Sequence, residues 1–169
     1  MNIMINQINR NTCFIYSLFH IIFLGEIVLE EIKDPRMIRL LRGLIKIYHT
    51  LGVPAGGGWG GRFFVWKVDG FICGVAWIGS SAPFRHIAHL FRIDLNNSYM
   101  IRRIVRTCPG DHLVSFLNAL AERLRNEGKE VLWTLGLDDH SNALYKKAGF
   151  ELAGYTPKKG LPVFVRRLR

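Results

Sequence analysis

Two stretches of the chain repeat apolar residues at intervals of three and four, the period of an amphipathic helix. The first follows Asp34-Pro35, which supplies a helix N-cap and a proline suited to the first helical position, and it ends before Gly52. Its apolar positions are Ile38, Leu41, Leu44, Ile45 and Tyr48. The second stretch has apolar positions at Leu113, Phe116, Leu117, Leu120, Ala121 and Leu124. We therefore predict a helix after residue 34 and a second, more regular one after residue 111.

Shorter β-prone runs lie between and around these helices. Residues 62–68 and 71–78 flank Asp69-Gly70, a turn pair typical of a β-hairpin. Further strands are predicted at 27–32, 100–107, 131–137 and 164–168, and a short helix at 141–148 ends at Gly149. Residues 83–99 show no clear period. Strands that alternate with helices predict an α/β fold with a sheet of mixed direction.

The length of 169 residues suits one domain, and 49% hydrophobic residues exclude wholesale disorder. Residues 13–24 are almost wholly apolar, but this run is shorter than the roughly 18–20 residues that span a membrane. We expect residues 1–25 to be an apolar extension and residues 26–169 to form the domain. The extension could be an extra packed element, a weak membrane anchor or a stretch upstream of the natural start.

The charge of the chain bears on its partners. Lys and Arg total 23 against 13 acidic residues, which gives a formal net charge of +10. This excess favours polyanions or phosphorylated ligands, including nucleic acid and coenzyme A, without selecting one of them.

The three cysteines, Cys13, Cys73 and Cys108, are far apart and form no C-x-x-C pair. We expect them to be separate buried thiols, with no disulfide framework and no zinc site. This usage is compatible with a reducing cytoplasm, where we expect the protein to be located.

The segment from Asn142 through Tyr145 to Gly149-Phe150 resembles the closing motif of the GNAT acyltransferases, the GCN5-related N-acetyltransferases. The order of hairpin, strand, glycine turn, helix, strand and short helix extends this resemblance over about residues 27–169. The chain is identified as a divergent member of that superfamily. The resemblance implies a mixed, mostly antiparallel central sheet flanked by helices, and acetyl-CoA as the cosubstrate.

In GNAT enzymes the acyl-CoA thioester lies where the strand before the long helix splays from its neighbour. Backbone N–H groups of the loop that enters this helix hold the pyrophosphate, because a helix N-terminus carries unpaired donors and partial positive charge. The resemblance places this cofactor site at Ile104, Val105, Arg106, Gly110, Asp111, His112 and Asn142. The loop departs from the family pattern, since Pro109 lacks an N–H and Asp111 brings negative charge. We favour Asp111 as the helix N-cap over a role at the phosphates.

The catalytic candidates follow from the same resemblance. Tyr145 corresponds to the tyrosine that protonates the departing thiolate in many GNAT members, a task that suits a phenol on an apolar wall. Asp139 and His140 follow the strand at 131–137 and are our candidates for the base, since histidine is a side chain suited to relaying a proton; Asp139 could equally be the N-cap of the next helix. His86, His89 and Asp94 are weaker candidates.

Three functions remain open at this stage, the third of them a non-catalytic interaction module. The first is an N-acyltransferase in which an amine, whose identity is open, attacks the thioester directly. The second is a GNAT-like nucleic-acid binder or a base-modifying enzyme similar to the phage Mom-type modifiers, with phosphate contacts from Arg36, Arg39, Arg42, Arg102, Arg103 and Arg106. Trp59 and Trp66 would then stack on bases. The oligomeric state, including a homodimer, is open as well.

Overall fold

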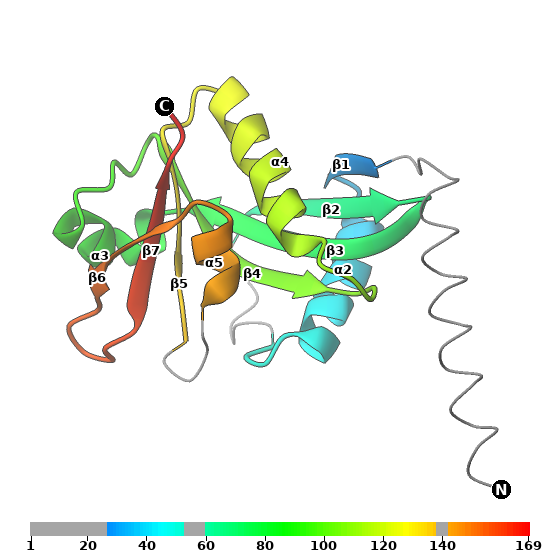
Figure 1. The fold of residues 1–169 in the computed structure, drawn as a ribbon, viewed down its shortest axis with the longest axis horizontal. Coiled ribbons are helices and arrows are strands. Elements are labelled where there is room, and N and C mark those ends of the chain that lie inside the picture. Colours follow the sequence, from blue (N-terminus) through cyan, green and yellow to red (C-terminus); the bar gives the residue numbers. More distant parts are fainter. Residues whose placement is uncertain (1–26, 53–59, 138–141) are drawn as a thin grey trace, which may run out of the picture.

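The computed structural model describes residues 27–52, 60–137 and 142–169, which form one seven-stranded sheet with helices on both faces (Figure 1). The strands are β1 (Ile27–Ile32), β2 (Arg62–Val68), β3 (Phe71–Ser80), β4 (Ser98–Arg106), β5 (Val131–Leu135), β6 (Glu151–Tyr155) and β7 (Pro162–Arg167). Their spatial order is β1-β2-β3-β4-β5-β7-β6. All neighbours are antiparallel except β4 and β5, which run parallel. The predicted mixed, mostly antiparallel α/β fold is confirmed.

The helices are α2 (Pro35–Tyr48), α3 (Arg85–Leu90), α4 (Leu113–Asn126), α5 (Ala143–Lys147) and the 3-10 turn η1 (Ala82–Phe84). Helices α2 and α3 cover one face of the sheet, and α4 and α5 cover the other (Figure 1). On the α4 face, Phe116 and Leu120 pack against Phe64 in the largest core cluster. On the α2 face, Leu41 and Ile45 pack into a separate cluster around β2 and β3. The centres of both apolar stripes are therefore buried as the sequence predicts, whereas Tyr48 at the end of α2 is 55% exposed.

Local sequence signals account for two boundaries. The carboxylate of Asp34 accepts hydrogen bonds from the backbone N–H groups of Arg36 and Met37, at 3.2 and 3.1 Å, as a helix N-cap does. Asp69 and Gly70 have φ angles of 53° and 80°, the left-handed conformation that a tight hairpin turn requires. Both predictions are confirmed.

Three details of the chain differ from the sequence expectations. The aperiodic segment 83–99 contains η1, α3 and the first residues of β4. An additional strand, β6, pairs with β7 at one edge of the sheet. The N-cap of α4 is His112, so Asp111 lies one residue before the cap.

The expectation of separate cysteine thiols is wrong for two of the three residues. Cys73 at the start of β3 forms a disulfide with Cys108, 35 residues later, with the Cα atoms 4.6 Å apart. The antiparallel pairing of Gly74 with Arg106 brings these distant positions together. The bond therefore ties the loop after β4 to β3, whereas Cys13 lies outside the described residues.

Within the ranges that the structure describes, no helix has both the length and the apolar character needed to cross a bilayer. The separation of residues 1–25 from the domain stays a prediction, because residues 1–26 are not among those described.

Candidate functional site

The site begins where β4 and β5 part. Their parallel pairing runs from Ser98 and Val131 to Ile101 and Thr134, and residues 102–106 of β4 continue beyond the last pair. On the other side of β4, the pairing with β3 shifts by one residue after Trp77, so that Arg102 forms a bulge. The bulge and the end of the ladder coincide, and they open the sheet at its centre.

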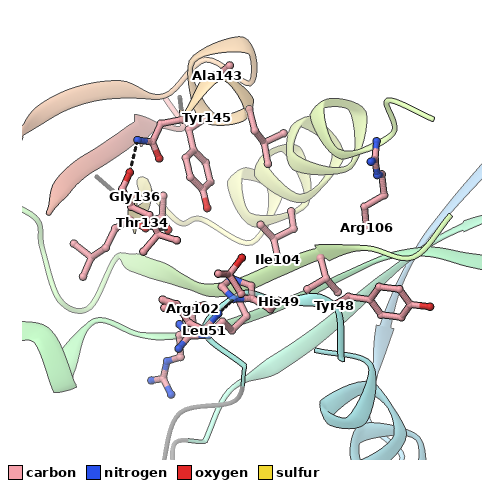
Figure 2. Close-up of a pocket in the computed structure, with 17 residues that line it drawn as sticks. Tyr48, His49, Leu51, Arg102, Ile104, Arg106, Thr134, Gly136, Ala143 and Tyr145 are labelled. Carbon is pink, nitrogen blue, oxygen red and sulfur yellow. Dashed lines mark hydrogen bonds between the residues drawn. The ribbon is translucent and has the colours of Figure 1, made fainter. Parts of the chain in front are cut away.

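A pocket of about 420 Å³, here named the splay pocket, fills this opening (Figure 2). Its walls come from β4, the end of β5, α5 and the residues that follow α2. Five of the predicted site residues lie in these walls: Ile104, Val105, Arg106, Asn142 and Tyr145. The structure therefore brings together residues that are about 40 positions apart in the chain.

Tyr145 extends from α5 into the splay pocket, and its ring packs against Phe150 and Phe164 (Figure 2). Burial raises the pKa of the Tyr145 phenol above its ordinary value, while a hydrogen bond with Thr134 and the positive charge of Arg103 act in the opposite direction. The phenol consequently keeps its proton at neutral pH and can donate it within the pocket.

The loop between β4 and α4 is held in a defined shape. Arg106 Nη1 donates a hydrogen bond to the carbonyl oxygen of Gly110 at 2.8 Å, and the Thr107 amide donates to the carbonyl of Cys73 at 3.1 Å. Gly110 has a φ of 110°, and a Cβ there would lie 2.6 Å from His112 Nε2. Glycine is therefore the residue that this turn requires.

A second hollow of about 160 Å³, here named the loop pocket, lies between this loop and α5. Asp111 and the first residues of α4, Leu113 and Val114, line it, and it shares Arg106 with the splay pocket. Among the described residues, no side chain caps the first turn of α4, so its N–H groups remain available to an anion. Gly110 and His112 shape the loop without lining either pocket.

Sequence reasoning did not single out for this site three residues that line the splay pocket: Arg102, Arg103 and Thr134. Arg102 is 6% exposed, and Arg103 Nε donates to the carbonyl oxygen of Gly52 at 2.8 Å. Burial lowers the pKa of both guanidinium groups. A pair of arginines inside an otherwise apolar strand was the signal that could have indicated them.

The remaining candidates are not gathered here. Asp139 and His140 lie outside the described residues, so their role as a base stays a prediction. His86 lines a different hollow, on the α3 side of the sheet. The carboxylate of Asp94 accepts hydrogen bonds from the amide of Asn96 and the side chain of Asn97, which assigns it to a turn. His89 is exposed on α3.

The features predicted for nucleic-acid contact are not all at the surface of the described residues. Trp66 is 7% exposed and stacks on Phe116 in the core, so it is not available to a base. Arg36 and Arg39 are exposed on α2, whereas Arg102 is buried in the sheet. Trp59 lies outside the described residues.

Comparison with known proteins gives one relative in sequence and many in structure. No protein-family model matches the chain. Uncharacterized protein 154 of the Sulfolobus islandicus rod-shaped virus 1 is 51% identical over 145 residues, covering 82% of this chain and 94% of that protein.

The structural relatives include acetyltransferases of the GNAT family. An aminoglycoside acetyltransferase, AAC(6')-Ib, solved with coenzyme A, superposes with a TM-score of 0.62 at 15% identity, covering 84% of this chain and 95% of that one. The ribosomal-protein-S18-alanine N-acetyltransferase of Escherichia coli gives a TM-score of 0.60 at 14% identity, covering 85% and 94% of the respective chains. These likenesses confirm the predicted GNAT fold.

Proposed function

We propose that this chain, which belongs to the family of protein 154 of the Sulfolobus islandicus rod-shaped virus 1 and has the GNAT fold, is an N-acyltransferase that takes its acyl group from a coenzyme A thioester. The observation that carries the proposal is the splay pocket, where β4 and β5 part beside the phenol of Tyr145. The structural relatives include an enzyme solved with coenzyme A, which supports the same ligand class here.

The described residues suit both the pyrophosphate and the thioester carbonyl of an acyl-CoA. The loop pocket offers the first turn of α4 to the pyrophosphate, with Arg106 between this pocket and the splay pocket. Pro109 provides no N–H, and the carboxylate of Asp111 repels a phosphate. The loop should therefore bind the pyrophosphate less tightly than a loop without an acidic residue. Main-chain groups of β4 beyond Ile101 lie past the last β5 pair and can polarise the thioester carbonyl.

The reaction needs no metal in its proton balance. The amine nitrogen attacks the carbonyl carbon, a C–N bond forms and the C–S bond breaks. The departing sulfur receives a proton from Tyr145, and the amine gives up its proton to a base, for which Asp139 and His140 remain the candidates. Transfer from a phenol to the sulfur is favourable only as the thiolate develops, because the neutral thioester sulfur is a poor base.

Thermal unfolding with and without acetyl-CoA tests the proposal. We expect a ligand concentration of about 100 times Kd to raise Tm by about 5–10 °C, because binding to the native state alone stabilises it. Tripolyphosphate is the control for unspecific anion binding to a chain of net charge +10. An equal shift with tripolyphosphate, or no shift with acetyl-CoA, would contradict the proposed function.

Asp111→Asn should bind coenzyme A about threefold more tightly than the unmodified protein. The substitution removes a negative charge beside the first turn of α4 while keeping the size of the side chain. Calorimetric titration measures the change, and Glu151→Gln, an equal change of charge on the edge strand β6, is the control. Unchanged affinity in Asp111→Asn would place the phosphates elsewhere.

A further inference from the structure

Two more hollows adjoin the splay pocket in a row. A middle hollow of about 190 Å³ shares Leu51, Arg103 and Leu135 with the splay pocket. An outer hollow of about 630 Å³ shares Phe84, Leu135 and Leu161 with the middle one. Because neighbouring hollows share walls, the three form a row that starts where the strands part and ends beside α3.

The lining of the middle and outer hollows is mostly apolar, with Arg102 and Arg103 on the middle hollow and His86 on the outer one. Met100 and Leu137 contribute to the middle hollow, and Phe84, Ile87 and Leu161 contribute to the outer one. Lys158 and Lys159 also border the outer hollow, where the aliphatic part of a lysine can cover an apolar ligand while its ammonium group stays in water. A space of this size and character is typical of a binding site for an apolar ligand.

We propose that the acyl group is a hydrocarbon chain longer than acetyl, and that its tail occupies the middle and outer hollows. This inference rests on the proposed function, since it places the thioester in the splay pocket. Ile101, the last β4 residue paired with β5, lines the middle hollow, so an acyl chain attached to a thioester where the strands part lies next to this hollow.

Charge favours a hydrocarbon tail over the amine acceptor in the outer hollow. A protonated amine would meet the like charges of Lys158 and Lys159, whereas a neutral chain meets no such repulsion. Among the described residues, neither the middle nor the outer hollow is lined by a carboxylate that could attract a cation.

Titration of the full chain with acetyl-, butyryl- and octanoyl-CoA, below any micelle concentration, tests the inference. Full burial of a methylene is worth up to about fourfold in affinity, so we expect octanoyl-CoA to bind at least about tenfold more tightly than acetyl-CoA. Leu161→Trp should abolish this gain and leave acetyl-CoA affinity unchanged, because Leu161 lines the middle and outer hollows and not the splay pocket.

The matched control is Leu152→Trp, the same substitution at an exposed position on β6, which should keep the gain. If Leu161→Trp fails to fold, Leu161→Phe makes a smaller change at the same place. Two results would overturn the inference while leaving the proposed function intact: equal affinities for acetyl- and octanoyl-CoA, or tighter binding of octanoyl-CoA that persists in Leu161→Trp. Octylamine that binds in the presence of coenzyme A and is excluded by Leu161→Trp, without a chain-length gain, would assign the hollow to the acceptor. Failure of every coenzyme A species to bind would contradict the proposed function itself.

Discussion

Tyr145→Phe is expected to lower kcat about 100-fold or more while leaving the affinity for the acyl-CoA nearly unchanged. The substitution removes only the hydroxyl group, and general acid catalysis contributes about 100-fold to 10,000-fold in enzymes that use it. The ring contacts with Phe150 and Phe164 do not require the hydroxyl, so the fold should persist. Steady-state kinetics with release of free thiol as the readout measures kcat and KM separately.

The matched control is Tyr155→Phe, because Tyr155 is 59% exposed on β6 and touches neither pocket. It should retain full activity. The pH profile adds a second measurement: burial raises the pKa of Tyr145, so an acid role predicts that the alkaline fall in kcat lies above the ordinary range of a phenol. A Tyr145→Phe variant with unchanged kcat would show that another group, or water, protonates the sulfur.

The parts of the fold that the sequence predicted are those that local periodicity determines. Leu41 and Ile45, or Phe116 and Leu120, recur at the helical period because one face of each helix is buried against the sheet. The Asp69-Gly70 turn could also be predicted from the sequence, since few residue pairs adopt positive φ at both positions without strain.

The features that the sequence did not predict depend on long-range contacts or lie in elements too exposed or too short to show a period. The Cys73–Cys108 disulfide depends on the register of β3 against β4, which cysteine spacing does not contain. Strand β6 lies at the edge of the sheet and is largely exposed, so Glu151, Leu152 and Tyr155 show no apolar alternation. Helix α3 has only six residues, too few to display a period.

The candidate site was predictable only as far as the family resemblance reached. That resemblance indicated Tyr145 and the β4 residues, and the structure places them in one pocket. It gave no indication of Leu51, Leu135 or Leu161, which three separate segments bring to the row of hollows. Ordinary aliphatic residues in a sequence do not reveal whether they face a core or a ligand.

The largest expected effect on stability is at Arg62, where the substitution Arg62→Met should lower the free energy of unfolding by about 2 kcal/mol. Its guanidinium donates to Glu31 on β1, at 2.7 and 2.8 Å, and to Glu127 after α4, at 2.5 and 2.9 Å. Arg62 therefore connects an edge strand to the end of the long helix. Removal leaves the carboxylates of Glu31 and Glu127, 17% and 27% exposed, without their shared cation, and Glu127 then keeps its contact with Arg123.

The pH dependence follows from the pKa values of these carboxyl groups. Hydrogen bonds from Arg62, and to a smaller extent from Arg123, lower the pKa of Glu127 to about 2, and a hydrogen bond from Arg62 also lowers the pKa of Glu31. A carboxyl group with a lowered native pKa stabilises the fold above its ordinary pKa and loses that contribution as the pH falls toward the native value. The difference between the unmodified protein and Arg62→Met should thus be full at neutral pH and shrink between about pH 4.5 and pH 2.

Urea unfolding at several pH values measures this difference. Arg125→Met is the control, because the Arg125–Glu122 pair on α4 is about half exposed on both sides, at 54% and 52%, and should contribute less than about 0.5 kcal/mol. Since methionine retains an apolar stem over Phe64, the loss in Arg62→Met reports the ionic contacts more than the packing. A loss of stability that does not change between neutral and acidic pH would assign the effect to packing instead, and the connection between β1 and α4 would then not be electrostatic.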